Sequence, residues 1–208
     1  MRPVKAYDAM NQDFIYLASA SPRRRELLDQ IGVRYHTHPV QVDESLRDNE
    51  TPDAYVRRLA VDKARAAWWA VAAKGPRPVL AADTAVVLDG EVFGQPRDRA
   101  HALAMLQRMS GRTHDVLTAV AVKLGAQEES ALSASRVTFR EISAGEREAY
   151  WRSGEPVGKA GAYAVQGRAA VFIAALEGSY SGVMGLPLFE TAKLLESIGY
   201  GAVHREQR

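Results

Sequence analysis

The stretch from Leu17 to Leu28, L-A-S-A-S-P-R-R-R-E-L-L, constrains the fold of this chain more than any other. An apolar run over Phe14 to Ala18 predicts a buried strand. Ser21 and Pro22 follow, and these residue types favour the N-cap and first turn of a helix. The stretch therefore predicts a strand, a short loop and a helix in succession. The buried face and the end of this helix are expected at Leu27, Leu28, Ile31 and Gly32.

Three arginines occupy the first turn of the predicted helix, where acidic residues are the norm. A cation at this end interacts unfavourably with the helix dipole and destabilises the helix by roughly 0.3–1 kcal/mol. A bound anion would make the arginines favourable at this position. The free N–H groups, serine hydroxyls and guanidinium groups together favour phosphate as that anion. Helical spacing puts Arg24 above the buried leucines, at the mouth of a cleft. The pattern favours a phosphate site with Ser19, Ser21, Arg23 and Arg24; the alternative is a solvated basic turn.

The composition indicates a globular protein of one large or one two-lobed domain. The 208 residues are 47% hydrophobic, the net charge is +2, and no cysteine is present. Such a charge argues against the alternative of a nucleic-acid-binding module, and the lack of cysteine excludes disulfides, thiolate metal sites and thiol nucleophiles. No apolar run reaches the about 18 residues that span a bilayer. We therefore expect a cytoplasmic protein with neither nucleic acid nor membrane as partner, and a flexible extension over residues 1–13.

The rest of the chain interleaves strands and helices. The Asp89-Gly90 pair predicts a hairpin between apolar runs, and two long strands follow each other directly after a helix. A hairpin and an adjacent strand pair within such an alternation predict a mixed α/β sheet. The strands are expected at 33–42, 78–82, 86–93, 113–124, 131–142 and 171–176, and the helices at 52–73, 99–109, 143–152 and from 187 onward.

Acidic residues and one lysine fall at positions that suit a site. Asp83 follows the short strand 78–82, and ligands of α/β sheets bind beyond the carboxyl ends of strands. Asp43 and Glu44 end the strand 33–42, while Lys63 lies on the inward face of the helix 52–73. An inward lysine is either paired or extends its amine to solvent. Carboxylates that bind a metal and activate water, with cations that hold phosphate, are what nucleoside triphosphate hydrolysis needs.

Several motifs in order resemble the Maf family of nucleotide pyrophosphatases. They are the L-A-S-A-S-P-R-R-R-E-L-L stretch, V-D-E-S, A-A-D-T, K-A-G-A-Y-A-V-Q-G and G-L-P, and the resemblance spans residues 14–198. It implies a mixed, twisted α/β sheet in two lobes with a central cleft, the architecture of inosine-triphosphate pyrophosphatases. It also implies a single Maf-like domain over 14–208 and a homodimer. The implied activity is hydrolysis of dTTP and UTP to the monophosphate and pyrophosphate, with Mg²⁺ or Mn²⁺ as cofactor.

The resemblance assigns a role to each matching residue. Asp83 resembles the general base, and Glu44 the acid that completes the metal or water site with it. Arg23, Thr84 and Gln166 match the positions that distinguish the branch acting on dTTP and UTP; the alternatives are a strand residue for Thr84 and a turn residue for Gln166. The positions that resemble the phosphate side are Ser19, Arg23, Arg24, Lys63 and Lys159.

One residue departs from the family pattern. Where members carry Gly-Lys-Pro after the hairpin, this chain has Gly94-Gln95-Pro96. Glutamine keeps hydrogen-bond donors and loses the charge. This leaves a second interpretation open, a nucleotide-binding regulator of cell division and septum formation with low turnover.

Overall fold

The computed structural model describes residues 14–201, and these residues form one seven-stranded sheet. The strand order is β2-β1-β3-β5-β6-β7, and β4 pairs with β3 beside this path. β1 is parallel to β2 and β3, whereas the other neighbours are antiparallel. The predicted mixed α/β sheet is therefore confirmed, while the predicted extension 1–13 lies outside the described residues. The strands are β1 (Ile15–Leu17), β2 (Tyr35–Thr37), β3 (Val79–Leu88), β4 (Glu91–Phe93), β5 (Thr113–Leu124), β6 (Gln127–Phe139) and β7 (Ile173–Glu177).

Helices cover the sheet, and most begin where the sequence predicts. Asp98 accepts a hydrogen bond from the backbone N–H of His101, and Ser143 forms a capping box with Glu146. Ser21 lies at the predicted N-cap position, although its side chain makes no capping bond. The short helix α5 was not predicted. The helices are α1 (Pro22–Gln30), α2 (Pro52–Val71), α3 (Arg99–Met109), α4 (Ala144–Arg152), α5 (Tyr180–Met184) and α6 (Leu188–Ser197).

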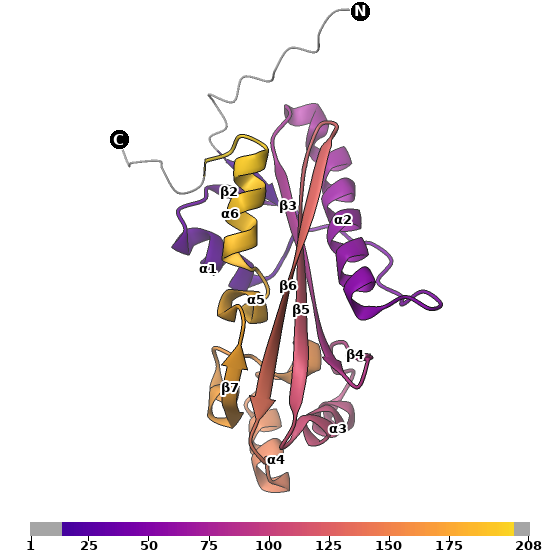
Figure 1. Ribbon diagram of the computed structural model, residues 1–208, viewed down its shortest axis with the longest axis vertical. Coiled ribbons are helices and arrows are strands. Elements are labelled where there is room, and N and C mark those ends of the chain that lie inside the picture. The colour runs from indigo at the N-terminus through magenta and orange to yellow at the C-terminus, as the bar shows by residue number, and fades with distance from the viewer. Residues whose placement is uncertain (1–13, 202–208) are drawn as a thin grey trace, which may run out of the picture.

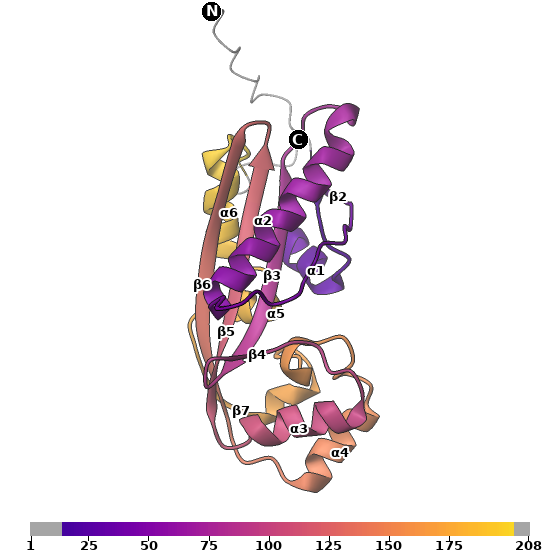
Figure 2. The same ribbon diagram turned by 90° about the vertical axis from the view of Figure 1, so that its right-hand side faces the viewer.

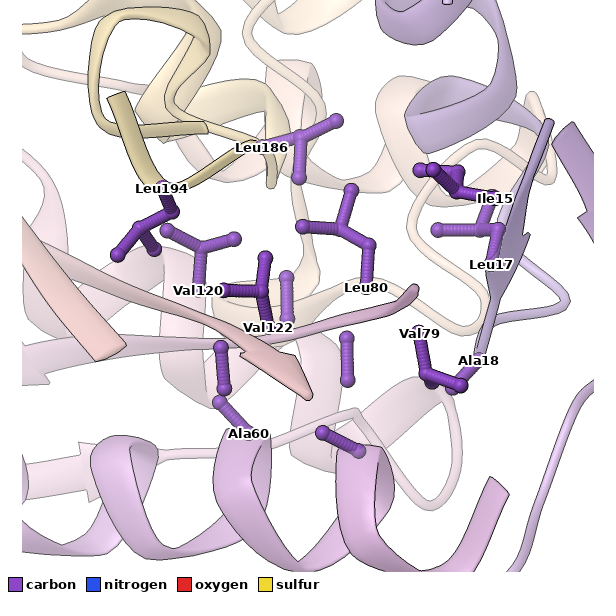
Figure 3. Close-up of a cluster of buried hydrophobic side chains, with 14 of the residues drawn as sticks. Ile15, Leu17, Ala18, Ala60, Val79, Leu80, Val120, Val122, Leu186 and Leu194 are labelled. Carbon is purple, nitrogen blue, oxygen red and sulfur yellow. The ribbon is translucent and has the colours of Figure 1, made fainter. Parts of the chain in front are cut away.

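The long strands β3, β5 and β6 run through two lobes (Figure 1). In the upper lobe α2 and α6 cover opposite faces of the sheet, and in the lower lobe α3 and α4 pack together (Figure 2). Each lobe has its own buried apolar cluster. Figure 3 shows the upper cluster, in which Leu80, Val120 and Leu194 pack on one side and Ala60 of α2 lies on the other. No helix among residues 14–201 is long and apolar enough to cross a bilayer.

The prediction of a short strand that stops before Asp83 was wrong. β3 continues from Val79 to Leu88, and antiparallel β5 pairs with it from Val79 to Val87. The ladder therefore passes through Asp83, which pairs with Ala119. A local apolar pattern cannot show that a partner strand across the sheet extends the pairing beyond a charged residue.

Other strand boundaries also differ from the sequence prediction. The strand expected over 33–42 forms only at Tyr35–Thr37, because its partner β1 has just three residues. The strand expected over 131–142 starts four residues earlier and ends at Phe139. The expected strand 171–176 begins at Ile173, after a 3₁₀ turn over Arg168–Phe172.

Candidate active site

A cleft of about 700 Å³ separates the two lobes, and residues of both line it. Ala18 to Arg24 come from the upper lobe, and Phe93 to Gln95 and Gly158 to Gln166 from the lower lobe. The structure thus brings together the side chains that the sequence analysis placed in the site, from segments far apart along the chain, with the exception of Asp43, whose carboxylate binds the N–H and hydroxyl of Ser45 outside the cleft lining. The side chains brought together are Ser19, Ser21, Arg23, Arg24, Glu44, Lys63, Asp83, Thr84, Gln95, Lys159 and Gln166.

The cleft opens at a gap along one edge of β3. β1 pairs with β3 only at Val79 and Leu80, and β4 pairs with it only from Val86 onward. Asp83 and Thr84 lie between these two pairings. As consecutive strand residues they point to opposite faces of the sheet. A ligand in the gap can therefore meet the carboxylate on the α2 side and the hydroxyl on the α5 side.

On the α2 side two carboxylates converge on one ammonium group. Nζ of Lys63 lies 2.7 Å from Oδ1 of Asp83 and 2.6 Å from Oε1 of Glu44. The Lys63 and Asp83 side chains are each 12% exposed, whereas that of Glu44 is 58% exposed. Burial raises the pKa of Asp83, and this effect outweighs the opposing influence of Lys63 and Arg24. The inward lysine of the sequence analysis is therefore a paired one.

On the other side Arg24 is bound by neutral oxygen atoms. Its Nε donates to the Gly185 carbonyl at 2.8 Å, Nη1 to Oγ of Ser19 at 3.2 Å and Nη2 to Oγ1 of Thr84 at 3.4 Å. Burial lowers the pKa of Arg24, with partial compensation by the charge of Asp83. A guanidinium held in this way is oriented without being neutralised, so the cleft wall carries positive charge toward its interior.

The sequence analysis missed α5, the element that holds both arginines. Nε of Arg23 donates to the carbonyl of Met184 at 3.3 Å, next to the Gly185 carbonyl that binds Arg24. These carbonyls lie at the C-terminus of α5, where backbone acceptors lack partners within the helix. Two residues in the sequence could have indicated this helix. Ser179 caps its N-terminus, and Gly185 ends it with φ 112°. Five residues are too few to show helical periodicity.

The lower lobe contributes Gln95, Lys159 and Gln166. Gln95 and Gln166 are exposed to the cleft, and Nζ of Lys159 donates to the Val157 carbonyl at 3.2 Å. Burial lowers the pKa of Lys159, and the charge of Arg23 lowers it further. Arg23 and Lys159 therefore place positive charge on facing lobes, at the two sides of the cleft.

A half-buried carboxylate, that of Glu155, binds the backbone next to Gln166. Glu155 accepts hydrogen bonds from the N–H groups of Arg168 and Ala169 and from the Tyr150 hydroxyl. A Cβ atom at Gly167 would overlap Oε2 of Glu155, so a larger residue there would displace this carboxylate from its hydrogen bonds. These hydrogen bonds therefore hold the turn that presents Gln166 to the cleft.

A two-lobed α/β protein with cations on both walls of its cleft and a lysine-bridged carboxylate pair defines a class suited to polyphosphate ligands. The chain belongs to the Maf family, since the family model described as Maf-like protein matches residues 14–198.

The chain is also similar to several named proteins. The chain is 57% identical to the dTTP/UTP pyrophosphatase of Alkalilimnicola ehrlichii over 88% of this chain and 91% of that one. It is 54% identical to the dTTP/UTP pyrophosphatase of Methylococcus capsulatus over 90% of this chain and 92% of that one. A solved nucleoside-triphosphatase / dITP/XTP pyrophosphatase from Mycobacterium abscessus is 17% identical, with a TM-score of 0.38 over 60% of this chain and 73% of that one.

Proposed function

We propose that this protein hydrolyses dTTP and UTP between the α- and β-phosphates. Water attacks the α-phosphorus, the bond to the bridging oxygen breaks, and the monophosphate and pyrophosphate leave. Two relatives that match about nine-tenths of the chain carry the name dTTP/UTP pyrophosphatase. The homodimer and the cytoplasmic location expected from the sequence stay predictions.

The observation that carries the proposal is the environment of Arg24. Among residues 14–201 its three hydrogen-bond partners are neutral oxygens, which use three of the five N–H donors of a guanidinium and leave two. A partly buried cation with free donors favours an anionic ligand. In this proposal Arg24, with Arg23, Ser19 and Lys159, binds the triphosphate and stabilises charge on the leaving pyrophosphate.

The carboxylate pair fits a divalent metal. Glu44 and Asp83 both contact the single Nζ atom of Lys63, so the two carboxylates lie close together, and a metal ion would bind through their remaining oxygens. Residues 14–201 contain no group of three or more acidic, histidine or cysteine side chains that could hold a metal. Mg²⁺ and Mn²⁺ suit such a site, because they accept one or two carboxylates and take their other ligands from phosphate and water. The metal would supply Lewis-acid polarisation of the phosphate and of the attacking water.

Asp83 is proposed as the general base. Its carboxylate has a raised pKa because it is buried, which makes it a stronger base than an exposed aspartate. Lys63 holds the carboxylate in place and stabilises its charged form before the proton arrives.

Thr84 and Gln166, with Arg23, are proposed to select the base. Uracil and thymine present acceptors at O2 and O4 and a donor at N3. The amide of Gln166 offers both a donor and an acceptor, so it can match such an edge. Gln166 is exposed in the cleft on the lobe opposite Arg24.

The proposal is tested by product analysis of a turnover screen over the common nucleoside triphosphates with Mg²⁺ and with Mn²⁺. We expect dTTP and UTP to give monophosphate and pyrophosphate in equal amounts, with purine nucleotides and CTP turned over far more slowly. Orthophosphate with a diphosphate product would contradict the proposed bond cleavage. A preference for CTP or a purine would contradict the proposed specificity.

Substitution of Gln95 tests the departure from the family pattern. Gln95 lines the cleft in the lobe that also supplies Lys159. A lysine there would add a charge-assisted hydrogen bond to the triphosphate worth roughly 1.5–3 kcal/mol. Gln95→Lys should therefore raise kcat/KM on dTTP about tenfold. Steady-state kinetics beside wild type, with the fold confirmed by thermal melting, measure this. An unchanged kcat/KM would show that Lys159 or another cation already supplies the charge.

A further inference from the structure

Three side chains and one carbonyl form a continuous hydrogen-bond chain behind the cleft. Nη2 of Arg24 lies 3.4 Å from Oγ1 of Thr84, which lies 2.9 Å from Oγ1 of Thr118. Oγ1 of Thr118 lies 2.8 Å from the Gly182 carbonyl in α5. Thr118 is fully buried, and it is paired with Thr84 across β3 and β5. Thr118 itself does not line the cleft.

The donor and acceptor of every hydrogen bond in this series are fixed by the two groups at its ends, the Arg24 guanidinium and the Gly182 carbonyl. The Gly182 carbonyl can only accept, so the single hydroxyl proton of Thr118 is donated to it. Thr84 must then donate its own proton to Thr118. The Thr84 oxygen is left as an acceptor, and Arg24, which can only donate, supplies the matching N–H. All donors and acceptors are consistent in this arrangement and in no other.

We propose that Thr118 is a positioning residue, which holds the Thr84 hydroxyl as an acceptor and thereby orients Arg24 toward the phosphates. Without the Thr118 hydroxyl, the Thr84 proton can rotate toward Arg24, where it would oppose a guanidinium N–H. The inference rests on the proposed function only in taking the cleft as the phosphate site. It adds a buried residue that no motif of the sequence analysis included.

Thr118 also reaches the arginines by a second route. The Gly182 carbonyl that it binds belongs to α5, and the carbonyls of Met184 and Gly185 just beyond hold Arg23 and Arg24. One hydroxyl therefore ties the position of α5 to the rotamer of Thr84. The Gly182 carbonyl also accepts from the N–H of Gly185 at 2.9 Å, so loss of the Thr118 hydroxyl does not leave it unbonded.

The test is calorimetric binding of inorganic tripolyphosphate to the intact protein. Thr118→Val keeps the shape and removes the hydroxyl, and it should weaken binding about tenfold. Thr118→Ser restores the hydroxyl and should bind within about twofold of wild type. The matched control is Thr113→Val on the same strand, which removes a 2.8 Å bond to Thr138 outside the cleft. We expect Thr113→Val to leave the affinity unchanged.

The outcomes separate this inference from the proposed function. If folded Thr118→Val binds tripolyphosphate like wild type, Thr118 has only a structural role and the inference is wrong, while the proposed function stands. If wild type does not bind tripolyphosphate, the phosphate site and the proposed function both fail. Should Thr118→Val not fold, Thr84→Val removes the same bond from the other side and should show the same tenfold loss. An unchanged affinity of Thr84→Val would equally overturn the inference.

Discussion

Replacing Asp83 with asparagine is expected to lower turnover of dTTP by roughly 10²- to 10⁴-fold, the contribution typical of a general base. Asparagine has the same shape, but it cannot accept the proton of the attacking water. Loss of a charged metal ligand would add to the effect. Stability should change little, because Lys63 keeps its contact with Glu44 at 2.6 Å and one costly buried charge disappears.

Three measurements make the Asp83→Asn prediction specific. Thermal melting should show a native-like fold, and binding of dTTP should persist. In metal-free wild type, Asp83 should take up its proton at a higher pH than an exposed aspartate, because burial raises its pKa; a metal bound to the carboxylate would lower the pKa and extend activity to lower pH. The control is Asp115→Asn, which changes an exposed aspartate of β5 outside the cleft. Retention of more than about a tenth of wild-type activity in Asp83→Asn would assign the base elsewhere, with Glu44 the first candidate.

Arg24→Met and Lys63→Met should both abolish most activity but have different effects on stability. Arg24 contacts neutral oxygens, so methionine removes a desolvated cation and fills the space of its aliphatic stem. We expect kcat/KM to fall roughly 10²- to 10³-fold, as when a donor to a developing oxyanion is removed. The free energy of unfolding should stay within about 1 kcal/mol of wild type.

Lys63→Met leaves the carboxylate of Asp83 without its ammonium partner in a site where its side chain is 12% exposed. Removal of one partner from a buried ion pair costs about 3–5 kcal/mol, and uptake of a proton by Asp83 should keep the loss near the lower end. Urea unfolding of the two variants beside wild type compares these effects directly. Equal destabilisation by both substitutions would mean that Arg24 is a structural cation rather than a free anion ligand.

Local chemistry in the sequence predicted the helices and turns well. The Ser143 capping box and the Asp89-Gly90 hairpin depend on contacts within a few residues. Both therefore form in the folded chain as the sequence predicts. β5 runs over Thr113–Leu124 as predicted, because apolar and β-branched residues make up most of it. The arginines of the first turn predicted a cleft correctly, since an unfavourable charge at a helix N-terminus is visible without any tertiary contact.

Pairings across the sheet could not be predicted in this way. Asp83 was expected beyond a strand and lies within β3, because β5 extends the ladder past it. Thr118 looks like any buried β-branched strand residue, and its hydrogen bonds to Thr84 and Gly182 depend on register and on α5. The meeting of Lys63, Glu44 and Asp83 was predicted from their expected roles rather than from geometry. The roles themselves stay predictions until the variants are measured.

The division of the core between the lobes sets the order in which the chain can fold during synthesis. The buried residues of the lower cluster lie between Val86 and Phe172, so this cluster is complete well before translation ends. Those of the upper cluster range from Ile15 to Tyr200 and include Leu194 and Leu195 of α6. The face of β5 and β6 that α6 covers therefore stays exposed during synthesis until this helix has been made. Premature termination before α6 would leave a folded lower lobe attached to an unfinished upper one, a species prone to aggregation and proteolysis.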